Sequence, residues 1–269
     1  MKRRAFVKIA TAAAAGTAAM TSTVFALAEA KNREGKKPLN TVVFFTSDNG
    51  GINWGNLGSA DYRKLCDEQP INGGLRRGKS ALYEGGIRVP MIVSCPGTIP
   101  QGVVSDQPWY FPDAMATFAD IAGAEQFLPK QHDGRSVWPV LQGNRERLDP
   151  RPMYWNGYLF GPGFRQVVRL GPWKLMRFSA LGRSYGLATA KQPKDCPPPA
   201  HLELYNLDKD PGERNNVAQA HPEICRKLTG IMNDEYTPHP DFPLKESEKK
   251  MFKVRTWDDI AEVYPHYDD

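Results

Sequence analysis

Cysteine is scarce in this sequence, and its spacing excludes several kinds of site. The chain has 269 residues and only four cysteines, Cys66, Cys95, Cys196 and Cys225, none of them in a Cys-x-x-Cys pair. Zinc sites and redox motifs usually need such pairs, and a chain of this length does not depend on a disulfide framework. A Cys196–Cys225 bridge stays possible in an oxidising compartment, although scattered thiols more often serve as packing residues.

An excess of charge is also lacking once the first residues are set apart. The formal net charge is +5, but Lys2, Arg3, Arg4 and Lys8 fall within the first 28 residues, which contain no acid. Without these four positive charges the remainder keeps only +1 of the +5. We therefore expect neither nucleic acid nor an acidic membrane surface as a partner.

The first thirty residues have the pattern of an export signal. A charged start, the uncharged stretch Ile9 to Ala28 and small residues around Ala28 predict a signal peptide over residues 1–30. Arg3-Arg4-Ala5-Phe6-Val7-Lys8 resembles the twin-arginine motif, which predicts a periplasmic or secreted product. The alternative is a membrane anchor, but we expect no stable anchor because so many Ala, Thr and Ser residues partition weakly into lipid.

Residues 31–40 form an expected polar linker, and an α/β domain is predicted for residues 41–150. The unbroken apolar run from Thr41 to Thr46 is typical of a strand buried on both faces of a sheet. It ends at Ser47-Asp48-Asn49-Gly50-Gly51, and ligands usually bind at this end of strands in open α/β sheets. A second strand is predicted from Val89 to Cys95, and a helix from Pro112 to Gly123.

A small α+β domain is predicted for residues 151–238. Residues 166–170, 174–178 and 201–207 are strand candidates, the first two around a Gly-Pro turn. Residues 223–236 carry apolar side chains at helical spacing, so we expect an antiparallel sheet with one packed helix. Residues 239–269 are rich in charge and proline, which predicts an extended tail.

One motif favours a different function. Gly73-Gly74-Leu75-Arg76-Arg77-Gly78-Lys79-Ser80 matches the whole P-loop pattern of nucleotide hydrolases. Phosphate binding by this motif needs a strand that enters the loop and a helix that leaves it. The polar stretch before Gly73 predicts no buried strand, and Gly85-Gly86 would break a following helix. We therefore reject the nucleotide-binding interpretation.

Several motifs together resemble the type I sulfatases of the alkaline-phosphatase superfamily. These motifs, in the family's order, are Asp48-Asn49-Gly50, the segment from Gly78 to Pro90, Asp133-Gly134-Arg135-Ser136 and the segment from Leu204 to Asn216. The resemblance covers about residues 41–236 and implies the C-terminal half of that family. The implied fold is part of an alkaline-phosphatase-like α/β sheet domain followed by a small C-terminal α+β domain. The implied activity is arylsulfatase-type hydrolysis of sulfuric esters.

The resemblance also assigns roles to single residues. It implies that Asp48 and Asn49 bind a divalent cation, usually Ca²⁺ and alternatively Mg²⁺, which suits oxygen ligands. It implies that Lys79 contacts the sulfate oxygens, where a positive charge can stabilise developing negative charge. Taken alone, the Asp-Asn-Gly-Gly string would be an ordinary turn and Lys79 an exposed loop lysine.

Other residues of these motifs have an expected architectural role. Adjacent glycines at Gly85 and Gly86 allow close backbone approach, and the guanidinium of Arg88 can fork onto carbonyls or a carboxylate. Glu84 is likewise expected to have a structural role. Arg76 and Arg77 are expected to be solvated loop charges.

The family's nucleophile is missing from this sequence. It is a formylglycine made from Cys or Ser within a Cys/Ser-x-Pro-x-Arg motif, and no such pentapeptide occurs here. The family's first acidic metal pair and its upstream histidines and lysine would precede Thr41. His132, His201, His221, His239 and His266 match no site position, so surface or packing roles are expected for them. We therefore expect an incomplete cation site and a chain that is inactive alone.

Three functions remain open at this point. The first is a truncated polypeptide of the sulfatase family, whose substrate would be a sulfate ester or a sulfated glycan. The second is one half of a two-chain sulfatase, in which a complementary half supplies the nucleophile. The third is a noncatalytic exported module that binds sulfated glycans.

Overall fold

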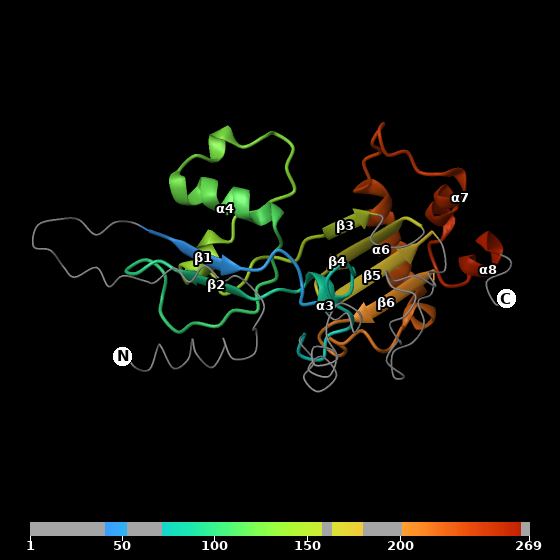
Figure 1. Ribbon diagram of the computed structural model, residues 1–269, viewed down its shortest axis with the longest axis horizontal. Coiled ribbons are helices and arrows are strands. Elements are labelled where there is room, and N and C mark those ends of the chain that lie inside the picture. Colours follow the sequence, from blue (N-terminus) through green and yellow to red (C-terminus); the bar gives the residue numbers. More distant parts are fainter. Residues whose placement is uncertain (1–40, 53–71, 158–162, 180–200, 265–269) are drawn as a thin grey trace, which may run out of the picture. The chain divides into compact units, whose positions relative to one another are not determined.

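The computed structural model describes residues 41–52, 72–157, 163–179 and 201–264, which form a mixed α/β fold with antiparallel sheets (Figure 1). The predicted signal peptide and linker lie outside these residues. Residues Met1–Thr41 and Val42–Asp269 are separate units, and the elements described below belong to the second. Among the described residues, none of the helices has both the length and the hydrophobicity needed to cross a lipid bilayer.

The first two predicted strands form an antiparallel ribbon. Strand β1 (Val43–Thr46) pairs with β2 (Met91–Ser94), and Phe45 lies opposite Ile92. Phe44 packs edge-to-face on Phe118, with 5.0 Å between the ring centroids. Phe45 and Ile92 are 59% and 62% exposed, so the predicted burial of the first strand on both faces is wrong. The reason is that no further layer covers this side of the ribbon within the described residues.

Helix α4 (Pro112–Ala122) follows the ribbon and confirms the predicted helix. Proline at its first turn fixes a helical φ, and Gly123 ends it at a left-handed φ of 62°. The chain continues through the 3₁₀ turn η1 (Glu125–Phe127) and the short helix α5 (Trp138–Leu141). This part of the chain therefore has its own small apolar cluster, made of Val137, Val140 and Leu148.

The C-terminal part contains a four-stranded antiparallel sheet in the order β3-β4-β5-β6. Its strands are β3 (Met153–Gly157), β4 (Arg165–Leu170), β5 (Trp173–Phe178) and β6 (Leu202–Asn206). The last three confirm the predicted strands to within one residue at each end. Strand β3 was not predicted.

Both faces of this sheet are covered. Val168, Leu175 and Leu204 pack against α6 (Pro222–Asp234), the predicted helix, which follows the 3₁₀ turn η2 (Ala218–Ala220). Val167, Met176 and Tyr205 pack on the opposite side, against residues 81–83 ahead of the short helix α3 (Glu84–Ile87). Because successive side chains point to opposite faces of the sheet, the strands separate two apolar cores. Cys225 of α6 is buried, and Cys196, its possible partner in a bridge, lies outside the described residues.

The C-terminal residues are not extended. Residues 246–263 form α7 (Glu246–Lys249), the 3₁₀ helix η3 (Lys250–Lys253) and α8 (Asp259–Val263). Val254 and Ile260 are buried in the same core as α6, and Met251 is buried in a neighbouring cluster. The predicted extended tail is therefore wrong here, because apolar residues placed between the charges bury on the sheet domain.

We expect Ile260→Ala to lower the free energy of unfolding by about 2–4 kcal/mol, because Ile260 is 2% exposed and its removal leaves a cavity. Urea denaturation of the purified chain measures this loss. Glu262→Ala is the matched control on the exposed side of α8 and should change stability by less than about 0.5 kcal/mol. Equal effects of the two variants would show that α8 does not pack on the core.

Candidate active site

Backbone hydrogen bonds join the two loops that carry the predicted site residues. The Gly50 N–H donates to the Gly86 carbonyl at 2.9 Å, and the Lys79 N–H donates to the Gly51 carbonyl at 2.9 Å. The Asn72 side chain adds two bonds, because its Oδ1 accepts from the Gly51 N–H at 3.0 Å and its Nδ2 donates to the Arg77 carbonyl at 2.6 Å. The turn after β1 therefore lies directly against the loop before α3.

Glycine is required where these loops meet. A Cβ on Gly50 would lie 1.9 Å from the Gly85 carbonyl oxygen. A Cβ on Gly85 would lie 2.1 Å from the Arg77 oxygen, and one on Gly86 would lie 2.1 Å from the Ala81 oxygen. The predicted close backbone approach at Gly85 and Gly86 is confirmed, since any side chain there would displace backbone.

The structure brings the three predicted site residues onto these joined loops. Asp48 and Lys79 are exposed and Asn49 is half-buried. Within the described part of the chain, none of the three side chains forms a hydrogen bond or an ion pair, although the Ser47 hydroxyl donates to the Asn49 carbonyl at 2.9 Å. Their carboxylate, amide and ammonium groups are thus available to a ligand.

The oxygen donors suit a hard divalent cation in kind but not in number. Ca²⁺ takes about six to eight oxygen ligands, and Asp48 with Asn49 supplies only a few. The described residues contain no cluster of three or more His, Cys, Asp or Glu side chains that could hold a metal ion. They therefore do not make a cation site by themselves, and we derive no chemical step through a cation.

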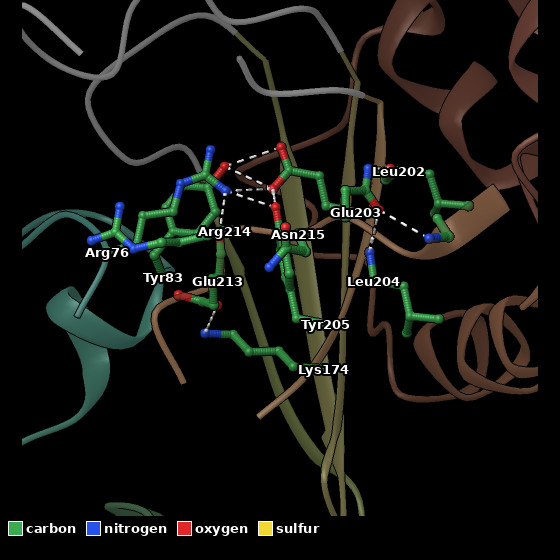
Figure 2. Close-up of polar contacts among 12 residues, drawn as sticks. Arg76, Tyr83, Lys174, Leu202, Glu203, Leu204, Tyr205, Glu213, Arg214 and Asn215 are labelled. Carbon is green, nitrogen blue, oxygen red and sulfur yellow. Dashed lines mark hydrogen bonds and ion pairs between the residues drawn. The ribbon is translucent and has the colours of Figure 1, made fainter. Parts of the chain in front are cut away.

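A buried lysine shared by two glutamates anchors α3 to the sheet, and Figure 2 shows its contact with one of them, Glu213. Lys174 Nζ lies 2.9 Å from Glu84 Oε1 and 2.8 Å from Glu213 Oε1. The Glu84 N–H donates to Glu213 Oε2 at 2.6 Å, so Glu213 contacts both the lysine and the helix backbone. Glu213 itself has a left-handed φ of 54°, which is uncommon for a residue other than glycine. The expected structural role of Glu84 is confirmed.

The two glutamates have opposite pKa shifts. Burial raises the pKa of Glu213 to about 7, and the neighbouring Glu84 charge raises it while Lys174 lowers it. Burial also acts upward on Glu84, but Lys174, with help from Arg169 and Arg88, holds the pKa of Glu84 below its ordinary value. Glu84 is consequently the ionised partner of Lys174, and Glu213 titrates near neutral pH.

Arg76 is buried, so its predicted role as a solvated loop charge is wrong. It is 4% exposed, and its Nη1 donates to Glu203 Oε2 at 3.2 Å and to the Tyr205 hydroxyl at 2.7 Å. Its guanidinium carbon lies 3.9 Å from the centroid of the Tyr83 ring, a cation–π contact. The Tyr83 hydroxyl also donates to Glu203, at 2.9 Å, so the buried charges are paired and bonded (Figure 2).

The two other arginines near this loop, Arg77 and Arg88, are less buried than Arg76. Arg77 is half-buried rather than fully solvated. Arg88 is exposed, and its guanidinium forms no hydrogen bond within the described residues, so its expected structural contact is not found. Only its backbone N–H takes part, donating to the Glu84 carbonyl at 2.8 Å.

Sequence reasoning missed the sheet residues that hold the loop. Lys174 of β5 and Glu203 of β6 lie on the face of the sheet that meets α3, among apolar neighbours. A charged residue in the middle of a strand predicted to be buried was the available signal, because such a charge needs a partner. Asn72, which bridges the two loops, had no comparable signal in its polar surroundings.

Two protein-family models match most of the chain. The family model described as N-sulphoglucosamine sulphohydrolase, C-terminal, matches residues 77–237. The family model described as Sulfatase matches residues 17–124. Together the two matches include every residue of the joined loops and the small sheet.

Individual relatives agree with these matches. A sulfatase of Formosa agariphila is 32% identical over 187 residues, which are 68% of this chain and 30% of that protein. Human steryl-sulfatase is 29% identical over 218 residues, 74% of this chain and 35% of that protein. An N-acetylgalactosamine-6-O-sulfatase of Bacteroides thetaiotaomicron is 27% identical over 200 residues, 74% of this chain and 37% of that protein. The chain thus spans about a third of the length of these curated relatives.

A solved structure supports the same fold. It comes from work on the metabolism of multiple glycosaminoglycans by Bacteroides thetaiotaomicron, and it superposes with a TM-score of 0.55 at 28% identity. The superposition covers 72% of this chain and 38% of that chain.

The raised pKa of Glu213 predicts a pH-dependent stability. Because the folded state favours the protonated carboxyl, this stabilising contribution is complete below the ordinary pKa of 4.5 and is lost as the pH rises through about 7. Glu213→Gln keeps a neutral side chain at all pH values, so it should lose less stability than the wild type between pH 5 and pH 8. We expect the difference to be on the order of 2 kcal/mol.

Urea denaturation at the two pH values measures this difference. Glu262→Gln is the matched control, because Glu262 is exposed and its side chain forms no ion pair within the described residues, and it should keep the wild-type pH dependence. Identical pH dependence of wild type and Glu213→Gln would contradict the assignment.

Proposed function

This chain belongs to the sulfatase family, and we propose that it supplies one side of an active site that hydrolyses sulfuric esters. The observation that supports the proposal is the pair of backbone hydrogen bonds that join the turn after Asp48 and Asn49 to the loop that carries Lys79. In this proposal Asp48 and Asn49 contribute oxygen ligands to a divalent cation, Ca²⁺ or Mg²⁺. When bound, the cation would polarise the sulfate group and help to neutralise its charge.

Lys79 has the clearest role among the chain's own residues. Its ammonium is exposed, free of protein partners within the described residues, and attached to a backbone that Gly51 fixes. A fixed positive charge of this kind orients a sulfate ester and stabilises negative charge that develops as the ester bond breaks. The buried ion pairs behind the loop keep it in place without using the Lys79 charge.

The proposed substrate is a sulfate ester, and a sulfated glycan is the class we favour. The name of the Bacteroides relative, N-acetylgalactosamine-6-O-sulfatase, supports a sugar sulfate. The twin-arginine-like start supports action in the periplasm or outside the cell. A noncatalytic module for sulfated glycans would use the same Lys79 contact and differs only in the absence of turnover.

The nucleophile has to come from outside this sequence, because no Cys/Ser-x-Pro-x-Arg pentapeptide is present. The proposal therefore includes a complementary sulfatase segment that carries the formylglycine and the remaining cation ligands. When such a segment binds the chain, it would complete the site.

We expect the purified chain to show no turnover of 4-nitrocatechol sulfate in the presence of Ca²⁺. The physical reason is that the chain has a sulfate contact but no nucleophile to attack sulfur. Absorbance assays of the chain and of Lys79→Ala should give the same background rate. A rate for the chain above that of Lys79→Ala would overturn the proposed need for a second segment.

A chimera tests the proposed roles directly. Residues 41–264 would replace the matching part of the Formosa agariphila sulfatase, whose remaining segment would complete the site. We expect turnover in the chimera and a loss of about a hundredfold or more in kcat/KM for Asp48→Asn or Lys79→Ala, the size found when a stabilising charge contact is removed.

Exposed residues outside the site supply the matched controls for the chimera. Asp106→Asn and Lys209→Ala make the same chemical changes and should leave kcat/KM within about twofold. An active chimera that tolerates Asp48→Asn and Lys79→Ala as well as these controls would refute the assigned roles.

A further inference from the structure

A cavity with several charged lining residues lies outside the loops of the candidate active site. Its volume is about 130 Å³. It is lined by several residues that lie between positions 107 and 153, by residues at the end of β4 and in the turn to β5, and by Asp208 after β6. It therefore lies between the α4 part of the chain and the four-stranded sheet, and domain junctions of this kind are frequent ligand sites. Its charged lining residues are Arg135, Arg147, Arg151, Arg169, Asp149 and Asp208.

Two of the four arginines have no carboxylate partner. Arg135 Nη2 donates to the Asp149 carbonyl at 2.8 Å, and Arg147 Nη2 donates to the Asp106 carbonyl at 3.1 Å. Both acceptors are neutral backbone oxygens, and neither arginine forms an ion pair within the part of the chain described. Their positive charges are therefore not neutralised by direct contact with an acid.

The other two arginines are committed in part. Arg151 pairs with the buried carboxylate of Asp113. Arg169 Nη1 lies 3.9 Å from Glu84, but the opposite oxygen of Glu84 is already bonded to Lys174 at 2.9 Å. Arg169 Nε donates to the Gly171 carbonyl at 3.2 Å, which again is a neutral acceptor.

Buried donor atoms on this cavity's arginines lack acceptors. The Nε atoms of Arg135 and Arg151 are buried and have no hydrogen-bond partner in the described structure. An unsatisfied buried donor costs about 1–3 kcal/mol, and more when the group is charged. Burial and the neighbouring Arg151 charge also lower the pKa of Arg135, as expected where positive charges gather. A bound anion would relieve the repulsion.

We propose that this cavity binds one small oxyanion of the sulfate class. Guanidinium groups present several N–H donors in a plane that matches oxyanions, so an arginine cluster suits such a ligand. A volume of about 130 Å³ is several times the share of about 30 Å³ that one water takes in the liquid, which is enough for one tetrahedral anion.

The composition of the lining also limits the ligand. Asp149 and Asp208 would repel a polyanion that extends along the surface, so a single charged group is the better match. That group has two possible sources, a free inorganic ion or a sulfate ester carried by a sugar. Because the lining comes from both sides of the junction, the bound anion holds the α4 part against the sheet. The inference is independent of the function proposed above, since it uses none of Asp48, Asn49 and Lys79.

Isothermal titration of the purified chain with sodium sulfate tests the inference, with sodium chloride used to keep the ionic strength constant. The key variant is Arg147→Gln, because Arg147 is exposed and carries no ion pair on which the fold depends. We expect it to weaken sulfate binding roughly tenfold, the loss expected for one charged hydrogen bond. Arg145→Gln is the matched control, an exposed arginine two residues away that does not line the cavity, and it should stay within about twofold.

Asp208→Asn should change the affinity for sulfate in the opposite direction from Arg147→Gln. This prediction can be tested even if Arg147→Gln does not fold. Removing this exposed carboxylate from the lining should tighten sulfate binding by about twofold or more. The dependence of sulfate binding on Arg147 should persist in a Lys79→Ala background, because Lys79 does not line the cavity, and this separates the cavity from the proposed active site. The experiment thus gives different results for failure of this inference and for failure of the proposed function.

A second titration, with N-acetylglucosamine 6-sulfate, distinguishes the two sources of the anion. Binding of inorganic sulfate that depends on Arg147 supports a free ion as the ligand. Binding of the sugar sulfate alone, with the same dependence on Arg147, supports a glycan-borne group. Binding of neither compound, or binding that responds equally to Arg147→Gln and Arg145→Gln, overturns the inference.

Discussion

The Lys174 ammonium, held between Glu84 and Glu213, is the contact on which the arrangement of this chain depends. Two buried carboxylates would repel each other without the lysine, and the lysine could not be buried without them. Removing Lys174 or Glu84 leaves an uncompensated charge inside the protein, whereas Glu213 is largely protonated below its pKa of about 7. The cluster therefore fixes the position of α3 against β5 more specifically than apolar packing alone would, because the ion pairs can form in only one alignment of the helix on the strand.

Backbone contacts, rather than side-chain contacts, connect this cluster to the candidate site. Glu84 begins α3, the two glycines that follow it contact the turn after β1, and Gly50 and Gly51 carry the effect to Asp48. Arg76 and Glu203 add a second buried connection on the same face of the sheet. The result is a platform on which the side chains of Asp48 and Lys79 stay exposed, since within the described residues neither of them helps to hold the platform together.

Local patterns predicted most of the fold, and long-range partners explain what they missed. Alternation and turn chemistry located β4, β5 and β6, and proline and glycine located α4. Arg76 was misjudged because its acid, Glu203, lies 127 residues away, and no local pattern reveals such a partner. The C-terminal helices were missed for a related reason, because their few apolar residues gain stability only from burial on the sheet. The close approach at Gly85 and Gly86 was predictable, since paired glycines have a local backbone consequence.

The open face of the β1–β2 ribbon and the unpartnered site residues have one physical explanation under the function proposed here. Phe45 and Ile92 form an exposed apolar pair, and Asp48 follows the same strand only three residues later. Under that proposal, a segment that brings a nucleophile to Asp48 and also packs on this pair would bury apolar surface and complete the cation ligands in a single contact. Hydrophobic burial would then supply association energy that two oxygen ligands and one lysine cannot, because exposed charges gain little from pairing in water.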